Sequence, residues 1–559
     1  MATTAPSINV IVNAAEAMVI WQYPKVIKDC WGFAVYRRKK GETTAAAEPL
    51  ISSVGFQGDK HAEWETEPTT IWPIQGYQWI DYTVRENDTV AYRVIPMKHT
   101  ATGLVKDETN ATAWSNWVTI KVDTTTAFTF NRGVVASQFM AKILKDQDGI
   151  KAKNKQLEDV IAMNDTKAVI RNILGGALLK LLYKFLDDVI AEKELQLYSS
   201  LYELNDPVII SKLNAIGKRA NLILANGAFN ADEPDPQAVN ADKLKKINVT
   251  RRIVKGAHFA HHKYFVVTRK KGSAETPEKV WTGSTNITMS GLCTQTNDAV
   301  IFTDQQVATY YLAQWKVLLA DCKNGKGTYG KPLLDFNDVK SYNKDKSVAT
   351  WFTPVHDTVD LKDATTYIKA AKQGILFLMF KPGGLDKMTL YNEILKRVDD
   401  NILIHGVINA DPGGKTNPTI TFIHKNKPTK KFIMGAVPAH IKEKLEYWMI
   451  EPAQKSVTIH SKLIVIDPFS KNPVVITGSN NFGEKASKSN DDNLNIIKGN
   501  SAMSIGFALG LFGIYKHYRW RFYRGSAGEK KWNGLQKTDE WQSYYITGDG
   551  KKELKFWSS

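Results

Sequence analysis

A short group of polar residues occurs twice in this chain, and the repetition strongly limits how the chain can fold. The first copy reads His261-His262-Lys263, followed by Gly283-Ser284-Thr285-Asn286. The second reads His460-Ser461-Lys462, followed by Gly478-Ser479-Asn480-Asn481. The two opening histidines lie 199 positions apart. A single His-x-Lys triplet carries little information, but two complete copies predict an internal duplication.

Each copy is expected to lie on two β-strands. Each triplet opens an apolar run, Tyr264–Val267 or Leu463–Ile466, and each Gly-Ser-x-Asn follows another, Val280–Thr282 or Val474–Thr477. Side chains alternate along a strand, so the His and Lys of one triplet share a face. Two neighbouring strands would then present His, Lys, Ser and Asn at one end of a sheet. In the first copy, the polar segment Arg269–Lys279 is interpreted as a hairpin loop.

The surrounding sequence indicates an α/β fold. A largely helical segment, Gln138–Ala191, precedes a predicted strand, helix and strand at Glu194–Glu203, Asp206–Lys218 and Ala220–Ala225. The second half alternates in the same way, with helix, strand, helix and strand at Leu361–Lys372, Gly374–Phe380, Asp386–Val398 and Asn401–Asn409. This alternation implies crossover units around mixed or parallel sheets.

The first 123 residues differ from the rest and read as an all-β sandwich. Short β-branched and aromatic runs are separated by turn-rich segments, at Ala17–Tyr23, Gly32–Arg38, Thr89–Met97 and Trp117–Val122. The pattern of Trp21, Phe33–Tyr36 and Tyr92–Val94 resembles a fibronectin type III-like domain. Such modules are usually spacers or contact a protein or surface partner. The Thr-rich Asp123–Thr129 segment is the predicted linker, which leaves lobes at 130–350 and 351–559.

The duplicated residues resemble the HKD motif of the phospholipase D superfamily, HxKxxxxD followed by GSxN. The second copy matches in full, at His460, Lys462, Asp467, Gly478, Ser479 and Asn481. Downstream, Asp492 falls where the family has the acidic residue that orients the catalytic imidazole. The first copy departs from the pattern, with Thr268 in place of the motif aspartate and Asn297 where the second copy has Asp492. The resemblance implies two pseudo-symmetric α/β lobes with mixed sheets and one active site complete within a monomer.

The resemblance also implies a chemical role for each motif residue. A phosphodiester resists attack because its charge repels nucleophiles, and Lys263 and Lys462 can hold its non-bridging oxygens. Further hydrogen bonds to these oxygens are expected from the amides and hydroxyls of Asn286, Asn481, Ser284 and Ser479. One histidine attacks phosphorus to form a phosphohistidine, and the other acts as general acid and base.

Following the superfamily, we assign His261 as the nucleophile and His460 as the general acid/base. The reverse assignment stays open at this point. Asp492 beside His460 would make that imidazole the more basic, while Asn297 would hold His261 through a neutral amide. Asp467 and Asn297 are expected to support the site. No cofactor or metal is expected, because the histidines lack the carboxylate or cysteine partners of a zinc or two-metal centre.

Charge favours an anionic partner. The chain has 559 residues with 74 Lys and Arg against 57 Asp and Glu, a net charge of +17. Nucleic acid, anionic lipid and phosphorylated substrates all suit such a field. Within a hydrolase or transferase acting on phosphodiesters, a phospholipid substrate is preferred and a nuclease is the alternative. A second alternative is a catalytically degenerate binding or scaffold protein, supported by Thr268 and Asn297.

The remaining features concern location and surface. Three cysteines, Cys30, Cys293 and Cys322, suit a reducing compartment. Neither a signal peptide nor a membrane span is expected, which favours a cytoplasmic or membrane-peripheral protein, with export by a signal-less route left open. The apolar stretches Asn172–Ile190 and Ser501–Tyr515 are interpreted as buried helices. Two basic clusters are interpreted as solvated loops, Arg251/Arg252/Lys255 and Lys425/Lys427/Lys430/Lys431. The aromatic run Tyr515–Tyr523 is interpreted as core packing.

Overall fold

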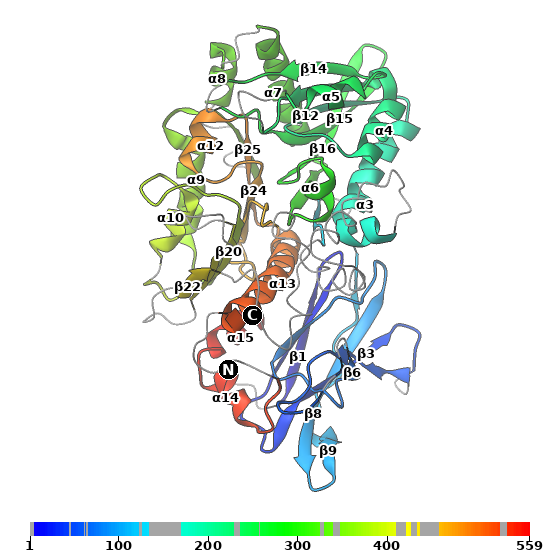
Figure 1. The fold of residues 1–559 in the computed structure, drawn as a ribbon, viewed down its shortest axis with the longest axis vertical. Helices are drawn as coiled ribbons and strands as arrows, with labels where there is room; N and C mark the ends of the chain where they lie inside the picture. Colours follow the sequence, from blue (N-terminus) through cyan, green and yellow to red (C-terminus); the bar gives the residue numbers. More distant parts are fainter. Residues whose placement is uncertain are drawn as a thin grey trace.

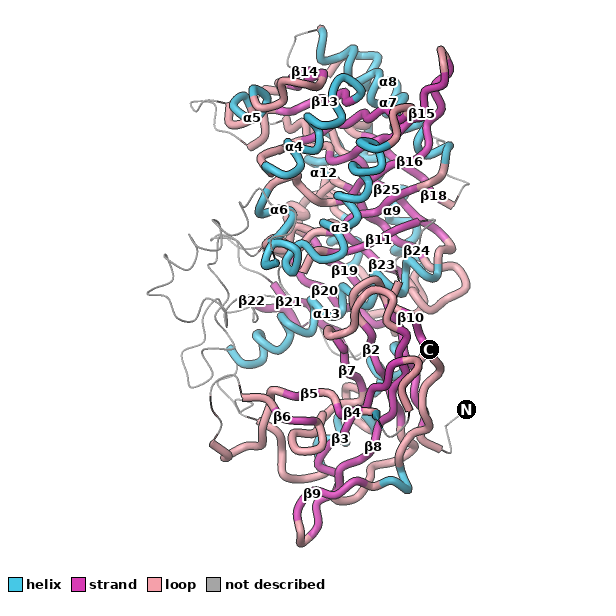
Figure 2. Tube along the Cα trace, turned by 90° about the vertical axis from the view of Figure 1, so that its right-hand side faces the viewer, coloured by secondary structure: helices cyan, strands magenta, loops and turns pink. Residues whose placement is uncertain are grey.

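The computed structural model describes residues 5–43, 46–60, 62, 65–121, 126–132, 169–228, 235–255, 258–324, 329–338, 347–397, 399–409, 421–425, 433–436, 458–525 and 534–559. The molecule is elongated, with an all-β domain at one end and two α/β lobes at the other (Figures 1 and 2). The predicted fold class, an all-β sandwich followed by two α/β lobes with mixed sheets, is confirmed. The predicted helix before residue 169 and three of the four lysines in the second basic cluster, Lys427, Lys430 and Lys431, lie outside the described residues.

The N-terminal domain contains two antiparallel sheets. One has the order β1-β2-β7, formed by Ser7–Val12, Ala17–Gln22 and Gln78–Asp81. The other has the order β10-β8-β3-β4 with β9 on β8, formed by Val118–Thr119, Thr89–Thr100, Cys30–Lys39, Glu48–Pro49 and Gly103–Lys106. A separate small pair joins β5 (Ile51–Ser52) to β6 (Glu67–Pro68). Aromatic rings fill the space between the sheets, where Phe33 contacts Trp21 at 5.5 Å and Tyr77 at 5.3 Å between centroids. The likeness to fibronectin type III stays a prediction.

The first lobe is built on a seven-stranded mixed sheet of order β11-β17-β16-β15-β12-β13-β14. Its strands are Thr126–Phe130, Asp298–Phe302, Ala274–Gly283, Lys263–Lys271, Leu195–Leu201, Ala220–Ala225 and Asn248–Arg252. Its helices are α3 (Val169–Ala191), α4 (Pro207–Ile216), α5 (Ala238–Asp242), α6 (Met289–Cys293), α7 (Gln305–Lys323) and α8 (Lys331–Asn337). Asp206 caps α4 by accepting hydrogen bonds from two backbone N–H groups of its first turn, and Pro207 follows at the first position, a typical helix start.

The second lobe repeats this arrangement with an eight-stranded sheet of order β18-β25-β24-β23-β19-β20-β21-β22. Its strands are Val348–Phe352, Asn493–Lys498, Val474–Gly478, Leu463–Ile466, Gly374–Met379, Leu403–Ile408, Thr421–Lys425 and Ile433–Ala436. Its helices are α9 (Val359–Ala370), α10 (Leu390–Leu395), α12 (Glu484–Ser489), α13 (Ser501–Gly525), α14 (Ser543–Ile546) and α15 (Lys551–Trp557). In the first lobe the motif strand β15 pairs with β12 on one side and with β16 on the other. In the second lobe β23 pairs with β19 and β24 in the same way, so the duplication seen in the sequence is also present in the structure.

Burial of both faces explains why the motif strands are continuously apolar. On β15, Val266 faces a central core shared with α7 and α13, while Phe265 faces the core under α3 and α4. On β23, Val465 faces the same central core and Ile464 faces α9 and α10. The two sheets therefore meet through their inner faces, and α13 lies between the lobes and the sandwich (Figure 1).

Two segments differ from the expected organisation. Part of the predicted linker forms β11, which pairs with β17 at the edge of the first-lobe sheet. The predicted hairpin loop Arg269–Lys279 is mostly strand, because β15 and β16 continue to a turn at Gly272-Ser273. The C-terminal segment returns to the sandwich, where Trp541 contacts Phe33 at 5.6 Å between ring centroids.

The two apolar stretches are helical, in α3 and α13, and Tyr515 and Tyr518 are buried, as the packing interpretation predicts. Within the described ranges, none of the helices has both the length and the apolarity to span a bilayer.

Candidate active site

The two HxK triplets meet at the junction of the lobes. His261 lies two residues before β15 and His460 three residues before β23, and each is fixed there by a backbone hydrogen bond to the opposite lobe. The His261 N–H donates to the Asp491 carbonyl at 2.8 Å, and the His460 N–H donates to the Thr296 carbonyl at 3.0 Å. This reciprocal pairing places each histidine beside the residue that directly precedes β25 or β17 in the other lobe.

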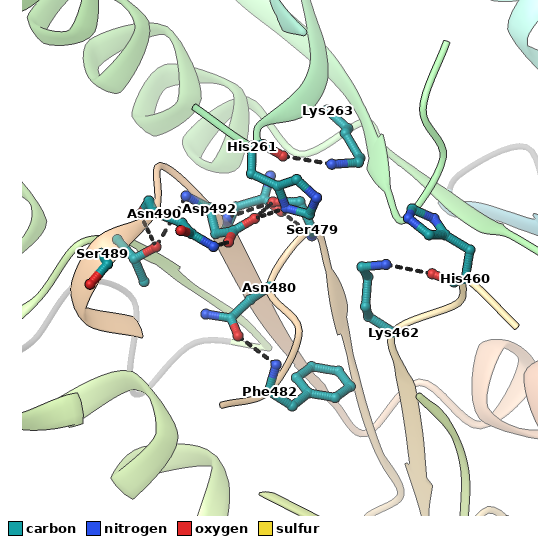
Figure 3. A network of polar contacts seen from close by, with 12 residues as sticks. His261, Lys263, His460, Lys462, Ser479, Asn480, Phe482, Ser489, Asn490 and Asp492 are labelled. Atoms are coloured by element: carbon teal, nitrogen blue, oxygen red, sulfur yellow. Dashed lines mark hydrogen bonds and ion pairs between the residues drawn. The ribbon is translucent and has the colours of Figure 1, made fainter. Parts of the chain in front are cut away.

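As a result, each imidazole is oriented from the other lobe. The distance between His261 Nδ1 and Asp492 Oδ1 is 2.7 Å (Figure 3). The distance between His460 Nδ1 and Asn297 Oδ1 is 2.9 Å. The expectation that Asp492 serves His460 and that Asn297 holds His261 is wrong. It assumed orientation within one lobe, whereas the cross-lobe backbone pairing exchanges the partners.

The two motif serines support these orienting residues. Ser479 Oγ donates to Asp492 Oδ1 at 2.6 Å, and Ser284 Oγ donates to Asn297 Oδ1 at 2.8 Å. Both serines are fully buried. The expectation that their hydroxyls donate to phosphate oxygens is therefore wrong in this geometry, because the single hydroxyl proton of each is already used.

The two lysines are held in matching ways. Lys263 Nζ donates to the His261 carbonyl at 2.8 Å and lies 4.9 Å from the centre of the Tyr202 ring. Lys462 Nζ donates to the His460 carbonyl at 2.6 Å and lies 5.0 Å from the centre of the Phe380 ring. Each ammonium keeps two further donors. Figure 3 shows both imidazoles and both lysine side chains gathered around one region between the lobes.

The two aromatic residues that hold these lysines were not predicted from the sequence. Tyr202 follows β12 and packs against His261 with ring centroids 4.7 Å apart, and Phe380 follows β19 and packs against His460 at 4.8 Å. Each of these aromatic residues directly follows the strand that pairs with a motif strand, β12 in one lobe and β19 in the other. This shared position is the signal that could have identified them.

The two motif asparagines are not equivalent. Asn286 Nδ2 donates to Glu203 Oε2 at 2.8 Å, which makes Glu203 a third residue that the sequence analysis missed. Among the described residues, the side-chain carbonyls of Asn286 and Asn481 have no hydrogen-bond partner. Both of these atoms are acceptors, so a hydrogen bond to a phosphate oxygen would have to come from the amide N–H groups.

The position of the motif aspartate is structural in both copies. Asp467 accepts three backbone N–H groups, from Lys372, Gln373 and Gly374 at 2.7, 2.7 and 2.9 Å, and so anchors the chain that leads into β19. In the first copy Thr268 Oγ1 donates to Glu275 at 2.7 Å instead. In the first copy one side-chain hydrogen bond therefore stands where the second copy has three bonds to the backbone, and no group of the site is removed.

Burial controls the charge of the site. It lowers the pKa of His261 to about 4, helped by the charge of Lys263 and opposed by Asp492. Burial, with Lys462 and Lys263, also lowers the pKa of His460 well below its ordinary value. The pKa of Lys263 falls to about 7, again mainly through burial. Burial alone would raise the pKa of Asp492, but the charge and hydrogen bond of His261, together with Lys263, lower it. The free site therefore holds neutral imidazoles and an ionised Asp492.

Other candidate groups near the motifs are structural. His262 is fully buried and its Nε2 lies 3.1 Å from Gln314 Nε2, on the opposite side of the strand from His261, as predicted. Arg252 was expected on a solvated loop, but it is buried and pairs with Asp321 and Asp491 at 2.5 and 3.0 Å. In the part of the chain that the structure describes, no three His, Cys, Asp or Glu side chains are arranged to hold a metal ion.

Residues 365–505 match the family model described as "Cardiolipin synthase, PLD-like domain". This region is a phospholipase D-like domain. It contains the second HxK triplet, Ser479, Asn481 and Asp492, whereas the first HxK triplet lies in the first lobe, outside the matched residues. The comparison with curated proteins gave no match.

Solved structures that match the chain do so at low sequence identity. Polyphosphate kinase from Porphyromonas gingivalis is 8% identical with a TM-score of 0.36, over 66% of this chain and 53% of that one, so the match spans about half of the kinase. Phosphatidylserine synthase from Haemophilus influenzae Rd KW20 is 10% identical with a TM-score of 0.38, over 60% and 84%. Yeast tyrosyl-DNA phosphodiesterase is 11% identical with a TM-score of 0.31, over 56% and 85%.

Proposed function

We propose that this protein is a phosphodiesterase that works through a covalent phosphohistidine at one site shared by the two lobes. The observation that carries the proposal is the crossed pairing of His261 with Asp492 and His460 with Asn297. Each histidine depends on the other lobe for its orientation, so neither lobe holds a complete site.

His261 is the proposed nucleophile. Its Nδ1–H is donated to the Asp492 carboxylate, which leaves the Nε2 lone pair free to attack phosphorus. The low pKa of His261 keeps the imidazole neutral at neutral pH, as a nucleophile requires. Asp492 then stabilises the positive charge that develops on the ring as the N–P bond forms.

His460 is the proposed general acid and base. Its Nδ1–H is donated to the neutral Asn297 carbonyl, which does not stabilise a positive ring as a carboxylate would. Lys263 and Lys462 lower the pKa of His460 in the free site. The negative charge of a bound phosphodiester offsets these two lysines, so binding favours the protonated His460 that the leaving oxygen needs. As the P–O bond breaks, Nε2–H of His460 protonates the departing oxygen.

In the second step His460 acts as the base and His261 is the leaving group. Neutral His460 removes a proton from water or an alcohol, and the oxygen attacks phosphorus of the phosphohistidine. The N–P bond breaks and returns its electron pair to His261. Lys263 and Lys462, with the side-chain amides of Asn286 and Asn481, are the proposed ligands of the non-bridging oxygens. Water as the acceptor gives hydrolysis and an alcohol gives transfer.

A phospholipid is the first candidate substrate, supported by the cardiolipin synthase description of the matching family model. A nucleic acid is the second candidate, favoured by the net charge of +17, because a basic field attracts a polyanion. The scaffold alternative is not favoured, because all eight His, Lys, Ser and Asn positions of the two motifs are present in the sequence.

The decisive experiment measures turnover of the purified chain in excess EDTA against mixed phospholipid vesicles and against single- and double-stranded DNA. We expect cleavage of one substrate class that disappears in both His261→Ala and His460→Ala. His356→Ala, at an exposed histidine far from the motifs in sequence, is the matched control and should keep full activity. Activity retained by either motif variant would contradict a shared site. No cleavage by the unmodified protein, of any substrate, would favour the scaffold alternative.

The role assignment has its own test. Rapid alkaline quenching during turnover, followed by peptide mass spectrometry, should find the phosphoryl group, still carrying its second ester substituent, on His261 alone. Phosphate on His460 would reverse the two roles.

A further inference from the structure

The two halves of the site differ in the charge of one residue. Glu203 follows Tyr202 at the end of β12, and the equivalent place after Phe380 in the second lobe is Lys381. Glu203 is half-buried, and its carboxylate accepts hydrogen bonds from Asn286 Nδ2 at 2.8 Å and, more weakly, from the Ala228 N–H at 3.4 Å. A carboxylate therefore contacts one of the proposed phosphate ligands directly.

Glu203 also acts on the lysine of the same half. Its negative charge opposes the fall in the pKa of Lys263, so it helps to keep that ammonium charged. The charge of Lys263 in turn limits the rise in the pKa of Glu203 that burial causes. Two carboxylates, Glu203 and Asp492, thus face a site with two lysines, and the positive charge available to an incoming anion is small.

We propose that Glu203 is a specificity-determining residue that restricts the site to phosphate groups with a single negative charge. This inference rests on the proposed function, since it takes Asn286 and Lys263 as phosphate ligands. A phosphodiester carries one charge, and the lysines are sufficient for it. A phosphomonoester carries about two charges at neutral pH, and its second charge adds repulsion from Glu203. At the separation set by the Asn286 side chain, this repulsion corresponds to about tenfold in affinity.

The test uses two ligands that differ by one charge and need no turnover. Dimethyl phosphate is a monoanion, and methyl phosphate carries a charge of about −1.5 to −2 at pH 7, where Lys263 still holds part of its charge. Both are titrated into the full chain and into Glu203→Gln by phosphorus NMR. The Gln variant removes the charge while its amide oxygen can still accept from Asn286. Glu194→Gln, an exposed carboxylate in the same strand region that pairs with Arg269, is the matched control.

We expect Glu203→Gln to bind methyl phosphate about tenfold more tightly and dimethyl phosphate with at most about a threefold change. Glu194→Gln should bind both ligands as the unmodified protein does. If Glu203→Gln does not fold, as judged by its thermal unfolding curve, Glu203→Ala removes the same charge and is read in the same way.

An equal gain for both ligands, an unchanged ratio of the two affinities, or binding of neither ligand by any of these proteins would overturn the inference. Failure of the proposed function would look different: neither lipid nor DNA would be cleaved, while the change in the ratio of affinities at Glu203 could still be measured. Where a diester is cleaved, Glu203→Gln should also lower the ratio of kcat/KM for the diester over the matching monoester.

Discussion

Asp492 of the second lobe lies 2.7 Å from Nδ1 of His261 in the first, so the only carboxylate bonded to a motif histidine comes from the opposite half of the described structure. Ser479 and Asn490 also donate to this carboxylate, at 2.6 and 3.3 Å. The partner of His460 is the neutral Asn297. This asymmetry favours His261 as the nucleophile, because a carboxylate stabilises the charge that forms on an attacking imidazole.

Replacing Asp492 by Asn should lower kcat by about 10²–10⁴-fold, because the ring of His261 loses the charge that fixes its tautomer and stabilises its cation. Steady-state kinetics with an unchanged thermal unfolding midpoint provide the measurement. Adding Asn297→Asp should not restore the rate, because the new carboxylate lies against His460. Recovery of activity in the double variant would show that the two histidines can exchange roles.

The motif serines should affect kcat and leave KM nearly unchanged. Ser479→Ala removes a hydrogen bond to a charged carboxylate, so we expect kcat to fall about tenfold or more. Ser284→Ala removes a bond to a neutral amide and should have a smaller effect. Lys462→Ala provides the contrast, because loss of a phosphate ligand should raise KM. A large rise in KM in Ser479→Ala would mean that its hydroxyl contacts substrate.

The pH dependence of kcat/KM should fall on the acid side as His261 gains a proton, and on the alkaline side as the groups that must carry one, His460, Lys263 and Lys462, lose it. Below a pH of about 4, His261 gains a proton and can no longer attack, so activity falls as the pH falls. Above about 7, Lys263 loses its charge in the free enzyme and binds the anion less well. In the kcat profile the alkaline limb should move to higher pH, because bound phosphodiester stabilises the charged lysine.

Glu203→Gln should shift the alkaline limb of kcat/KM to lower pH, because Glu203 helps to keep Lys263 charged. An unshifted limb would show that another group controls it. Circular dichroism across the same pH range separates titration of the site from acid unfolding.

Arg252 should be far more important for stability than its neighbour Arg251. Arg252→Met leaves Asp321 and Asp491 buried without their counter-charge and should cost about 3–5 kcal/mol in the free energy of unfolding. Arg251 pairs with Asp235 nearer the surface, with about a quarter of each side chain exposed, and Arg251→Met should cost about 0–1 kcal/mol. Urea denaturation of the two variants provides the comparison. Equal costs would mean that the buried pairs do not hold the lobes together.

Much of the fold follows from local pattern. The strand Ala220–Ala225 is formed as predicted, and the helix predicted at Asp206–Lys218 forms at Pro207–Ile216 with Asp206 as its cap. Apolar periodicity and capping residues act over a few positions, so they can be recognised without the rest of the chain. The boundary of the hairpin at Arg269–Lys279 was wrong, because pairing along β15 and β16 overrides the polar composition of the segment.

The residue types of the site, and their division between two halves, could be predicted from the HxK and GSxN spacing. Which residue orients which histidine could not. His261 and Asp492 are separated by 231 positions, and their contact depends on the backbone pairing of 261 with 491 across the lobes. The contacts of Arg252 and Glu203 could not be predicted either. Arg252 forms a buried ion pair with Asp491 of the other lobe, and Glu203 accepts a hydrogen bond from Asn286. Local chemistry selects the groups, whereas the packing of two sheets face to face decides which charges meet.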